Sequence, residues 1–488
     1  MTDAKVETKA EHALAIGEFE REKVPKTSVK SYLSFLAVFA GRHTAGTEFM
    51  IGPLFLVHGA SARNVVFGLF VGNCLATLTW RFWTAPVAIQ RRYTTYYCVE
   101  RICGQRALIL YNFFTGALLS MTAGAMCTVS ATAVGTLFDV QMPGLHDTFP
   151  NSLGFSSIVA LVGAVTASIA AFGYTYVSHF SLFLVPYMTI VIVYMAARSL
   201  SLLEISSASE FLSVTSKVVW TDRDPEPGYV KFDFWACVLS AWFCDLMLHI
   251  GMLDLSILRF GKTERVGWCS AAGMFLGHYF TWLVAGLLYA LQLRANPQDT
   301  AVKPGPMAHA VAGTNGLLCV LIAGWSTANP LMYAAGLAFQ SMLGDRCSTR
   351  VATLAAGALA VIAGLFPAVV MRILELLEYG GLVLLPIGVV LFFDCFVNPW
   401  LNFQIEAHVN EVTAWPAMVC WSVTTVITLS MALAGILEVY FLPLLGVPIA
   451  SLTYLGGCWL RDVHLPSRKR ASNDKSPGDL CTAPALCP

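Results

Sequence analysis

The sequence predicts an all-α protein that crosses a membrane many times. Of its 488 residues, 56% are hydrophobic and only 12% are charged. The mean hydropathy is +0.65. A soluble domain carries about twice that charged fraction. Apolar stretches long enough to span about 30 Å of hydrocarbon recur along the whole chain. The chain is therefore expected to be a polytopic membrane protein whose surroundings are a lipid bilayer.

Twelve apolar segments predict twelve transmembrane helices. They lie at 31–57, 64–89, 108–138, 155–173, 175–197, 234–258, 266–292, 309–342, 351–371, 373–397, 413–438 and 440–460. Because the number is even, both termini are expected on the same side of the membrane.

The distribution of Lys and Arg predicts that this side is the cytoplasm. Basic residues gather in the connections that share a side with the N-terminal tail, as the positive-inside rule requires. These residues are Lys23, Lys26, Lys30, Arg91, Arg92, Arg101, Arg106, Arg259, Lys262, Arg265, Arg346, Arg350, Arg468, Lys469 and Arg470. The loop 199–233 is basic on the opposite side, but it is long and rich in acidic residues, and long loops follow the rule weakly. The plasma membrane is the default expectation.

The same loop divides the chain into two halves. Five segments precede it and five follow before a final pair, which suggests a five-plus-five inverted repeat with two additional C-terminal helices. The expected divisions are a cytoplasmic tail at 1–30, a first repeat at 31–200, an extracytoplasmic loop at 201–232, a second repeat at 233–398, two last helices at 399–461 and a cytoplasmic tail at 462–488.

The first segment carries charges at the depth of mid-membrane. Arg42, His43 and Glu48 lie there with Gly41 and Gly46. A charge at that depth costs at least about 2.5 kcal/mol and usually has a function. The glycines favour an unwound stretch, and broken helices with polar groups at the midplane form the sites of many transporters. A structural Arg–Glu pair is the alternative, but residues six apart lie about 240° apart on a straight helix.

The sixth segment mirrors the first in depth. Asp245 lies about 16 Å from the outer start of its segment, and Arg42 lies about 16 Å from the inner start of its own. Asp245 and His249 are spaced to share a helix face. They could bind a polar ligand, relay a proton or satisfy one another. Asp254 lies near Arg259 and is expected to be structural.

The eighth and tenth segments carry further polar or helix-breaking positions. Ser326 and Thr327 offer hard oxygen ligands to a small cation such as Na⁺. Alternatively, their hydroxyls bond to carbonyls four residues earlier, as is common in membrane helices. Pro386 and Gly388 predict a kink or a gate, and Asp394 follows near the inner end.

Several function classes are excluded by composition and motifs. Zero net charge gives no basic surface for nucleic acid. Metalloprotease, Walker A and serine-nucleophile motifs do not occur, so an enzyme is not expected. The 14 cysteines form no CxxC pair or cluster with histidine, which predicts neither a disulfide framework nor a zinc site.

Motifs in order along the chain resemble the nucleobase–cation symporters of the cytosine/purine, uracil, thiamine and allantoin permease type. The resemblance covers roughly residues 18–460. The motifs are Val24-Pro25, Gly72-Asn73, Phe172-Gly173, Val185-Pro186, Arg259-Phe260-Gly261, Trp325-Ser326-Thr327, Tyr333–Phe339, Pro386–Gly388 with Asp394, and Pro448-Ile449-Ala450 with Tyr454.

The resemblance implies a fold, a cation site and a substrate class. The fold is the five-plus-five repeat with two added helices, and the substrate is a nucleobase such as cytosine or a purine. The sodium site would use Gly41, Thr44, Ala323, Ser326 and Thr327.

The chain differs from this family at the positions that bind the substrate there. The family's third helix offers Gln and Trp, whereas Gly116–Thr122 here has neither. The Asn-rich pattern of the eighth helix is reduced to Asn329 before Pro330. The loss of an aromatic platform and the presence of Arg42 allow an organic anion or zwitterion instead.

The sequence therefore predicts a symporter that imports a nucleobase or related small polar heterocycle with Na⁺ or H⁺ by alternating access. It needs no cofactor beyond the coupling ion. The alternatives are a carrier for a small organic anion or zwitterion, and a non-transporting membrane sensor built on the carrier scaffold. The candidate substrate-binding residues are Arg42, His43, Glu48, Asp245, His249 and Asn329.

Overall fold

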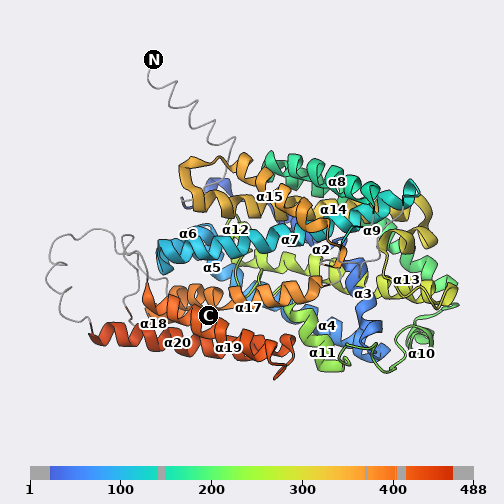
Figure 1. The fold of residues 1–488 in the computed structure, drawn as a ribbon. Helices are drawn as coiled ribbons and strands as arrows, with labels where there is room; N and C mark the ends of the chain where they lie inside the picture. The colour runs from blue at the N-terminus through green and yellow to red at the C-terminus, as the bar shows by residue number, and fades with distance from the viewer. Residues whose placement is uncertain are drawn as a thin grey trace, which may run out of the picture.

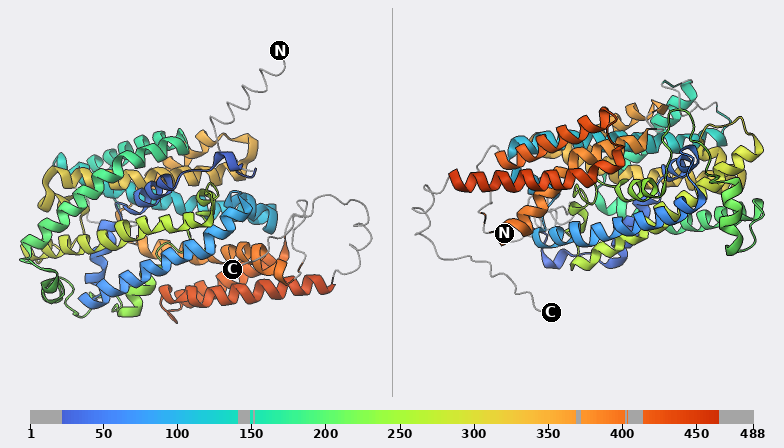
Figure 2. Two further views of the ribbon diagram at one scale, coloured as in Figure 1. Left: turned by 180° about the vertical axis from the view of Figure 1, so that it is seen from behind. Right: turned by 90° about the horizontal axis from the view of Figure 1, so that it is seen from below.

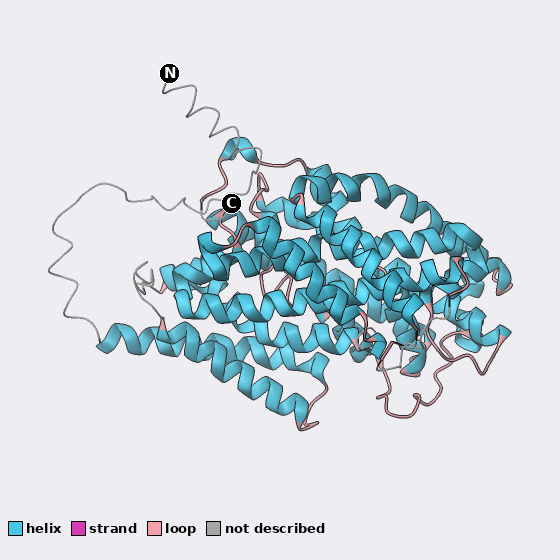
Figure 3. Ribbon diagram, turned by 45° about the horizontal axis from the view of Figure 1, so that its top comes forward, coloured by secondary structure: helices cyan, strands magenta, loops and turns pink. Residues whose placement is uncertain are grey.

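The computed structural model describes residues 22–140, 149–150, 152–368, 372–401, 403 and 414–464. Helices and the loops between them make up this part of the chain, which contains no β-strand (Figure 3). The all-α prediction is confirmed.

The described helices of the first half run from α2 to α10. They are α2 (Tyr32–His43), α3 (Glu48–Val57), η2 (Asn64–Gly68), α4 (Leu69–Thr79), η3 (Trp80–Thr84), α5 (Ala85–Arg91), α6 (Thr95–Cys103), α7 (Gln105–Leu137), α8 (Leu153–Ala171), α9 (Tyr174–Leu202) and α10 (Ala208–Val218). A short 3₁₀ turn, η1 (Lys26–Ser28), precedes them.

Helices of the second half complete the bundle. They are α11 (Phe234–Phe243), α12 (Leu255–Leu258), η4 (Glu264–Cys269), η5 (Ala272–Phe280), α13 (Thr281–Ala295), α14 (Pro304–Leu343), η6 (Gly344–Arg346), α15 (Thr349–Gly364), α17 (Ile373–Phe392), η7 (Phe393–Val397), α18 (Asn398–Trp400), α19 (Trp415–Leu433), η8 (Val439–Phe441) and α20 (Leu442–His464). The element α14 contains a kink at Gly313, where φ is 57°.

Length and hydropathy qualify nine helical stretches of the described residues as membrane spans. Three further apolar helices are shorter: Glu48–Val57, Phe234–Phe243 and Thr349–Gly364. The first two belong to predicted segments whose helices are broken. The prediction of many apolar spans is therefore confirmed, and the count of twelve depends on how broken helices are counted.

The outer surface of the bundle is apolar. Phe82, Leu161, Ile190, Val426 and Leu452 are each more than half exposed. A water-soluble protein rarely exposes so much continuous apolar surface, whereas hydrocarbon tails cover it without cost. The multi-pass membrane protein predicted from composition is the natural interpretation of this surface.

The helices pack side by side along one common direction (Figures 1 and 2). At the centre α7 and α14 pack along much of their length, and α8, α9 and α15 contact this pair. The last helices, α19 and α20, pack on each other and on α17. In Figure 1 the bundle has an end with α6 and α18, and an opposite end with α10 and α13; we call these the α6 end and the α10 end.

Two helices are interrupted near the middle of the bundle. In the first segment α2 ends at His43 and α3 begins at Glu48. In the sixth segment α11 ends at Phe243, and turns extend to α12 at Leu255. The first break lies where the glycines predicted it. The second was not predicted, and it removes the helix on which Asp245 and His249 were expected to share a face.

The tenth segment crosses the second break at a glycine. A Cβ atom on Gly388 of α17 would overlap the carbonyl oxygen of Ile250. That oxygen belongs to backbone, so a side chain here must displace one of the two segments. Gly456 on α20 is the matched contrast, because a Cβ atom there meets nothing within 4 Å.

We expect Gly388→Val to destabilise the protein by about 1–3 kcal/mol, the usual cost of overpacking. Gly456→Val should change stability by less than about 0.5 kcal/mol. Thermal unfolding of both variants in detergent measures the difference. Equal midpoints would contradict the close approach of α17 to the sixth segment.

Candidate functional site

The break in the first helix lies against α14. The hydroxyl of Ser326 donates to the carbonyl of Gly41 at 3.2 Å, and that of Thr327 donates to the carbonyl of Arg42 at 3.1 Å. Both hydroxyls also reach the carbonyl of Ala323, at 3.0 and 3.3 Å. The same hydroxyls therefore bond back along α14 and across to the first helix, and their role as cation ligands stays a prediction.

Four of the five predicted cation ligands are joined by these bonds. The fifth, Thr44, follows α2 directly, and its N–H donates to the carbonyl of Ala40 at 2.9 Å. Its hydroxyl is buried and has no hydrogen-bond partner among the described residues. Carbonyl and hydroxyl oxygens that converge on a helix break fit a small hard cation.

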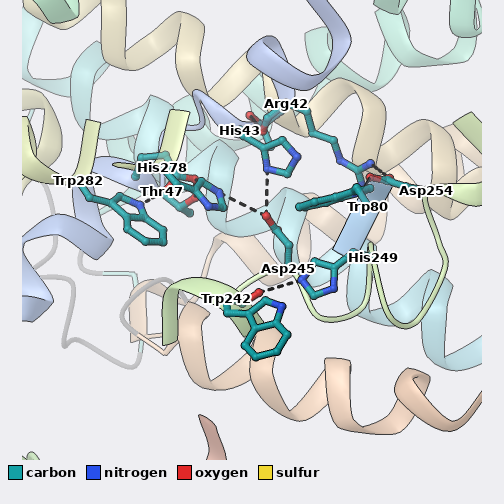
Figure 4. A network of polar contacts seen from close by, with 12 residues as sticks. Arg42, His43, Thr47, Trp80, Trp242, Asp245, His249, Asp254, His278 and Trp282 are labelled. Carbon is teal, nitrogen blue, oxygen red and sulfur yellow. Dashed lines mark hydrogen bonds and ion pairs between the residues drawn. The ribbon is translucent and has the colours of Figure 1, made fainter. Parts of the chain in front are cut away.

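A second group of polar side chains meets beside this break (Figure 4). Asp245, at the start of the sixth-segment break, lies between His43 of α2 and His278 of η5. Its Oδ2 atom is 3.1 Å from Nδ1 of His43 and 3.5 Å from Nε2 of His278. All three side chains are more than nine-tenths buried. We call these three residues the central cluster.

The seventh segment positions His278 through an irregular helix. Its η5 element is a π-helix, a form that is frequent at functional sites. Gly277 lets this element pack directly on α2, since a Cβ atom there would overlap the carbonyl of His43. The ring of His278 stacks on Trp282, with centroids 4.6 Å apart and planes 13° apart.

Glu48 adjoins the central cluster. The indole N–H of Trp282 donates to Glu48 Oε2, and the hydroxyl of Thr47 donates to Oε1 at 3.5 Å. Oε1 is also 3.8 Å from Nε2 of His278. Glu48 therefore faces the sixth and seventh segments, and it does not pair with Arg42.

Arg42 points away from the central cluster. Its Nη1 donates to Oδ1 of Asp254, and the indole N–H of Trp80 donates to Oδ2 of the same carboxylate at 2.8 Å. All three groups are buried. Asp254 was expected near Arg259, and its partner is instead the charge in the first helix. Arg42 is neutralised where it lies, and its assignment to substrate binding stays a prediction.

Two other predicted substrate residues lie outside the cluster. His249 has both ring nitrogens occupied: Nδ1 accepts from the N–H of Ile250 at 2.8 Å, and Nε2 donates to the carbonyl of Trp242 at 2.9 Å. Its backbone N–H donates to the carbonyl of Asp245 at 3.2 Å, but its ring bonds to other partners and not to the Asp245 carboxylate, contrary to the helical spacing argument. Asn329 is buried on α14, and its amide atoms have no hydrogen-bond partner among the described residues.

A small cavity of about 40 Å³ lies at the break of the first helix. Thr122 and Met126 of α7 line it, along with Leu377 of α17. The polar groups on its wall include Arg42, His43, Thr47, Glu48, Asp245, His278 and Thr327.

A much larger vestibule of about 1090 Å³ opens at the α10 end. Its wall carries the carboxyl groups of Glu375, Glu378 and Glu438 and the guanidinium of Arg372. His58, just beyond α3, also lines it, and burial lowers the pKa of this histidine. Leu377 lines the small cavity and its neighbour Glu378 lines the vestibule, so the two spaces border the same turn of α17.

The opposite, α6 end is held together by polar and aromatic contacts. Arg91 of α5 donates to Oδ2 of Asp394 in η7 at 2.5 Å. Trp83 stacks on Phe392, with centroids 3.9 Å apart and planes 2° apart. The hydroxyl of Tyr96 donates to the carbonyl of Ala334 at 3.1 Å. These contacts join the elements at the α6 end, while the open vestibule lies at the α10 end.

Solved transporters share the fold of this chain. Mhp1, a nucleobase-cation-symport-1 family transporter solved in a closed conformation with bromovinylhydantoin bound, matches with a TM-score of 0.69 over 92% of this chain and 97% of its own, at 14% identity. This chain has the fold of that transporter. The resemblance stated from the sequence motifs predicted it.

Two other solved proteins show how widely the fold is used. A Na⁺-coupled sialic acid symporter in an outward-open state matches with a TM-score of 0.61 over 90% of each chain, at 14% identity. A manganese transporter of Eremococcus coleocola matches at 0.55 over 90% of this chain and 97% of its own, at 13% identity. No family model matches the sequence, and no curated protein matches it. Function must therefore be argued from the site.

Sequence reasoning did not find His278, Trp80 or Trp282. His278 carried a usable signal, because it is an ionisable residue inside the seventh apolar segment and such residues are rare there. The tryptophans carried none, since an indole in a membrane helix is common. Only the fold shows that these two donate to Asp254 and Glu48.

We expect Asp254→Asn to destabilise the protein by about 3–5 kcal/mol, because it leaves the Arg42 guanidinium buried without a counter-charge. Glu226→Gln is the control, since it breaks the exposed pair with Arg223 and should cost at most about 1 kcal/mol. Thermal unfolding measures both. A similar loss in the two variants would show that the buried pair has no special role.

Proposed function

We propose that the chain is a secondary active transporter that imports a small polar solute with Na⁺ by alternating access. It would lie in the plasma membrane with both termini in the cytoplasm, so the vestibule would face outward. The observation that carries the proposal is the contact of the Ser326 and Thr327 hydroxyls with the carbonyls at the end of α2. The basic residues at the α6 end support this topology.

Binding of Na⁺ at this contact would couple to the solute site through the first helix. The cation would take the oxygens of Gly41, Ala323, Ser326 and Thr327 as ligands and hold the break against α14. His43 and Glu48 lie on either side of the same break and face the solute cavity. An ordered break favours solute binding by about 1–3 kcal/mol, the usual range of such coupling.

The resemblance favours a nucleobase or related heterocycle as the solute. Its N–H groups would donate to the carboxylates of Glu48 and Asp245, and the cavity would have to widen toward the vestibule. No Trp, Tyr or Phe is among the residues that line the cavity. The heterocycle would therefore stack on the imidazole rings of His43 and His278. An organic anion is disfavoured, since Arg42 is engaged by Asp254 while two carboxylates face the cavity.

Uptake into proteoliposomes tests the proposal. Labelled nucleobases and other small solutes are offered with an inward Na⁺ gradient, with a proton gradient, or with neither. Accumulation only with the Na⁺ gradient supports Na⁺ symport. Accumulation only with the proton gradient shows that H⁺ is the coupling ion instead. Absence of accumulation across the panel would refute the transporter and favour the sensor alternative.

We expect Thr327→Ala to raise the Na⁺ concentration for half-maximal uptake about tenfold, because a ligand worth about 1.4 kcal/mol or more is removed. The control is Thr166→Ala, which removes a buried hydroxyl that bonds only along its own helix, to the carbonyl of Val162. Na⁺ activation is measured in proteoliposomes at fixed solute concentration. An unchanged Na⁺ dependence in Thr327→Ala would refute the cation site.

The contacts at the α6 end should restrain the inward opening. We expect Asp394→Asn to populate the inward-open state, because Arg91 loses its charged partner. Maleimide labelling of Cys98 and Cys395, both buried near this pair, should then accelerate about threefold or more. Glu226→Gln at the α10 end is the control and should leave the labelling rate unchanged. Equal rates in both variants would contradict a gate at the α6 end.

A further inference from the structure

The central cluster brings together three metal-ligating groups from three separate segments. We infer that His43, Asp245 and His278 form a binding site for a divalent transition-metal ion. The inference deepens the proposed function, on which it rests for the position of the site, by naming a class of solute that fits the cavity as it stands. The metal ion and the heterocycle would then compete for the same cavity.

The distances within the cluster suit coordination. A tetrahedral ion with bonds of about 2.0–2.1 Å holds its ligand atoms about 3.3 Å apart. Asp245 Oδ2 lies 3.1 Å from His43 Nδ1 and 3.5 Å from His278 Nε2, and the three ligand atoms are all within 4.8 Å of one another. Small side-chain rotations would therefore place an ion between them (Figure 4).

The ordinary explanation is a buried ion pair between Asp245 and a histidine. That explanation needs one imidazole whose N–H points at the carboxylate. Two imidazoles instead approach one oxygen, and Asp245 Oδ2 accepts no hydrogen bond from the described residues. A buried oxygen without a donor costs about 1–3 kcal/mol or more, which a bound cation would recover.

The surrounding donors select the kind of ion. Imidazole and carboxylate suit Zn²⁺, Co²⁺ and related ions, and sulfur ligands are softer still. Cys244, Met126 and Met247 also line the cavity, and Glu48 lies beyond His278. Na⁺, Mg²⁺ and Ca²⁺ prefer oxygen ligands, so this set differs in kind from the oxygens at Ser326 and Thr327. The volume of about 40 Å³ holds an ion or a water molecule.

The rings are held in place by aromatic packing. His278 stacks on Trp282, and His43 lies parallel to Phe39, with centroids 6.0 Å apart and planes 7° apart. This packing orients both imidazoles toward Asp245 before any ion arrives, which reduces the cost of binding. The vestibule, with three carboxyl groups against one guanidinium, would concentrate cations at the entrance.

Co²⁺ binding to the purified chain in nanodiscs tests the inference without any ion gradient. Calorimetry and the visible absorption of Co²⁺ should show one ion per chain. His278→Gln and Asp245→Asn should each weaken the affinity about tenfold or more. His249→Gln is the matched control, a buried histidine whose two nitrogens are already hydrogen-bonded, and its Co²⁺ affinity should stay within about twofold of wild type.

The results separate this inference from the transport proposal. The metal site is overturned if the folded wild-type protein binds no Co²⁺. It is also overturned if the His278→Gln and His249→Gln variants bind Co²⁺ with equal affinity. Neither result affects the proposal of Na⁺-driven solute uptake. Absence of uptake by a protein that binds Co²⁺ overturns transport alone.

If the cluster variants do not fold, diethyl pyrocarbonate labelling of the wild-type protein replaces them. Co²⁺ should protect His43 and His278 from modification, as mapped by mass spectrometry, and leave His58 as reactive as before. Equal modification of His43 and His278 with and without Co²⁺ overturns the site.

Discussion

The cost of placing polar groups in a low-dielectric interior governs this structure. The first helix ends at His43 and resumes at Glu48, so backbone groups and three ionisable side chains lie where the surroundings are apolar. Each ionisable side chain faces a different neighbour. The sixth segment supplies Asp254 to Arg42 and Asp245 to His43, the seventh supplies Trp282 to Glu48, and the eighth supplies hydroxyls to the carbonyls. Four segments must therefore be in register for the break to exist.

This arrangement assigns separate tasks to adjacent residues. Arg42 holds the sixth segment through Asp254, and His43, one residue later, faces the solute cavity. The oxygens near Ser326 are hard ligands, whereas the central cluster offers imidazole nitrogen beside carboxylate. Two different cations can be distinguished by these two ligand sets. The fold is shared with carriers of quite different solutes, so the ligand set decides what this chain binds.

The two cavities and the contacts at the α6 end distinguish the two ends of the bundle. The vestibule and the small cavity border the same turn of α17, at Glu378 and Leu377. The α6 end is closed by the pair of Arg91 with Asp394 and by the stack of Trp83 on Phe392. Under the proposed alternating access, closing the vestibule and parting these contacts would both involve the segment from α17 to η7.

The sequence by itself determined the class of fold, the apolar segments and the break in the first helix, because hydropathy, helix-breaking glycines and the rarity of intramembrane charge are properties of the chain read locally. It also determined the motif at Ser326 and Thr327. The partners were decided by tertiary structure alone. Arg42 meets Asp254, and Asp245 meets two histidines from other segments, while the break in the sixth segment turns His249 away. The physical reason is that a buried charge is neutralised by whichever group the packing brings within reach, and linear spacing carries no information about that group.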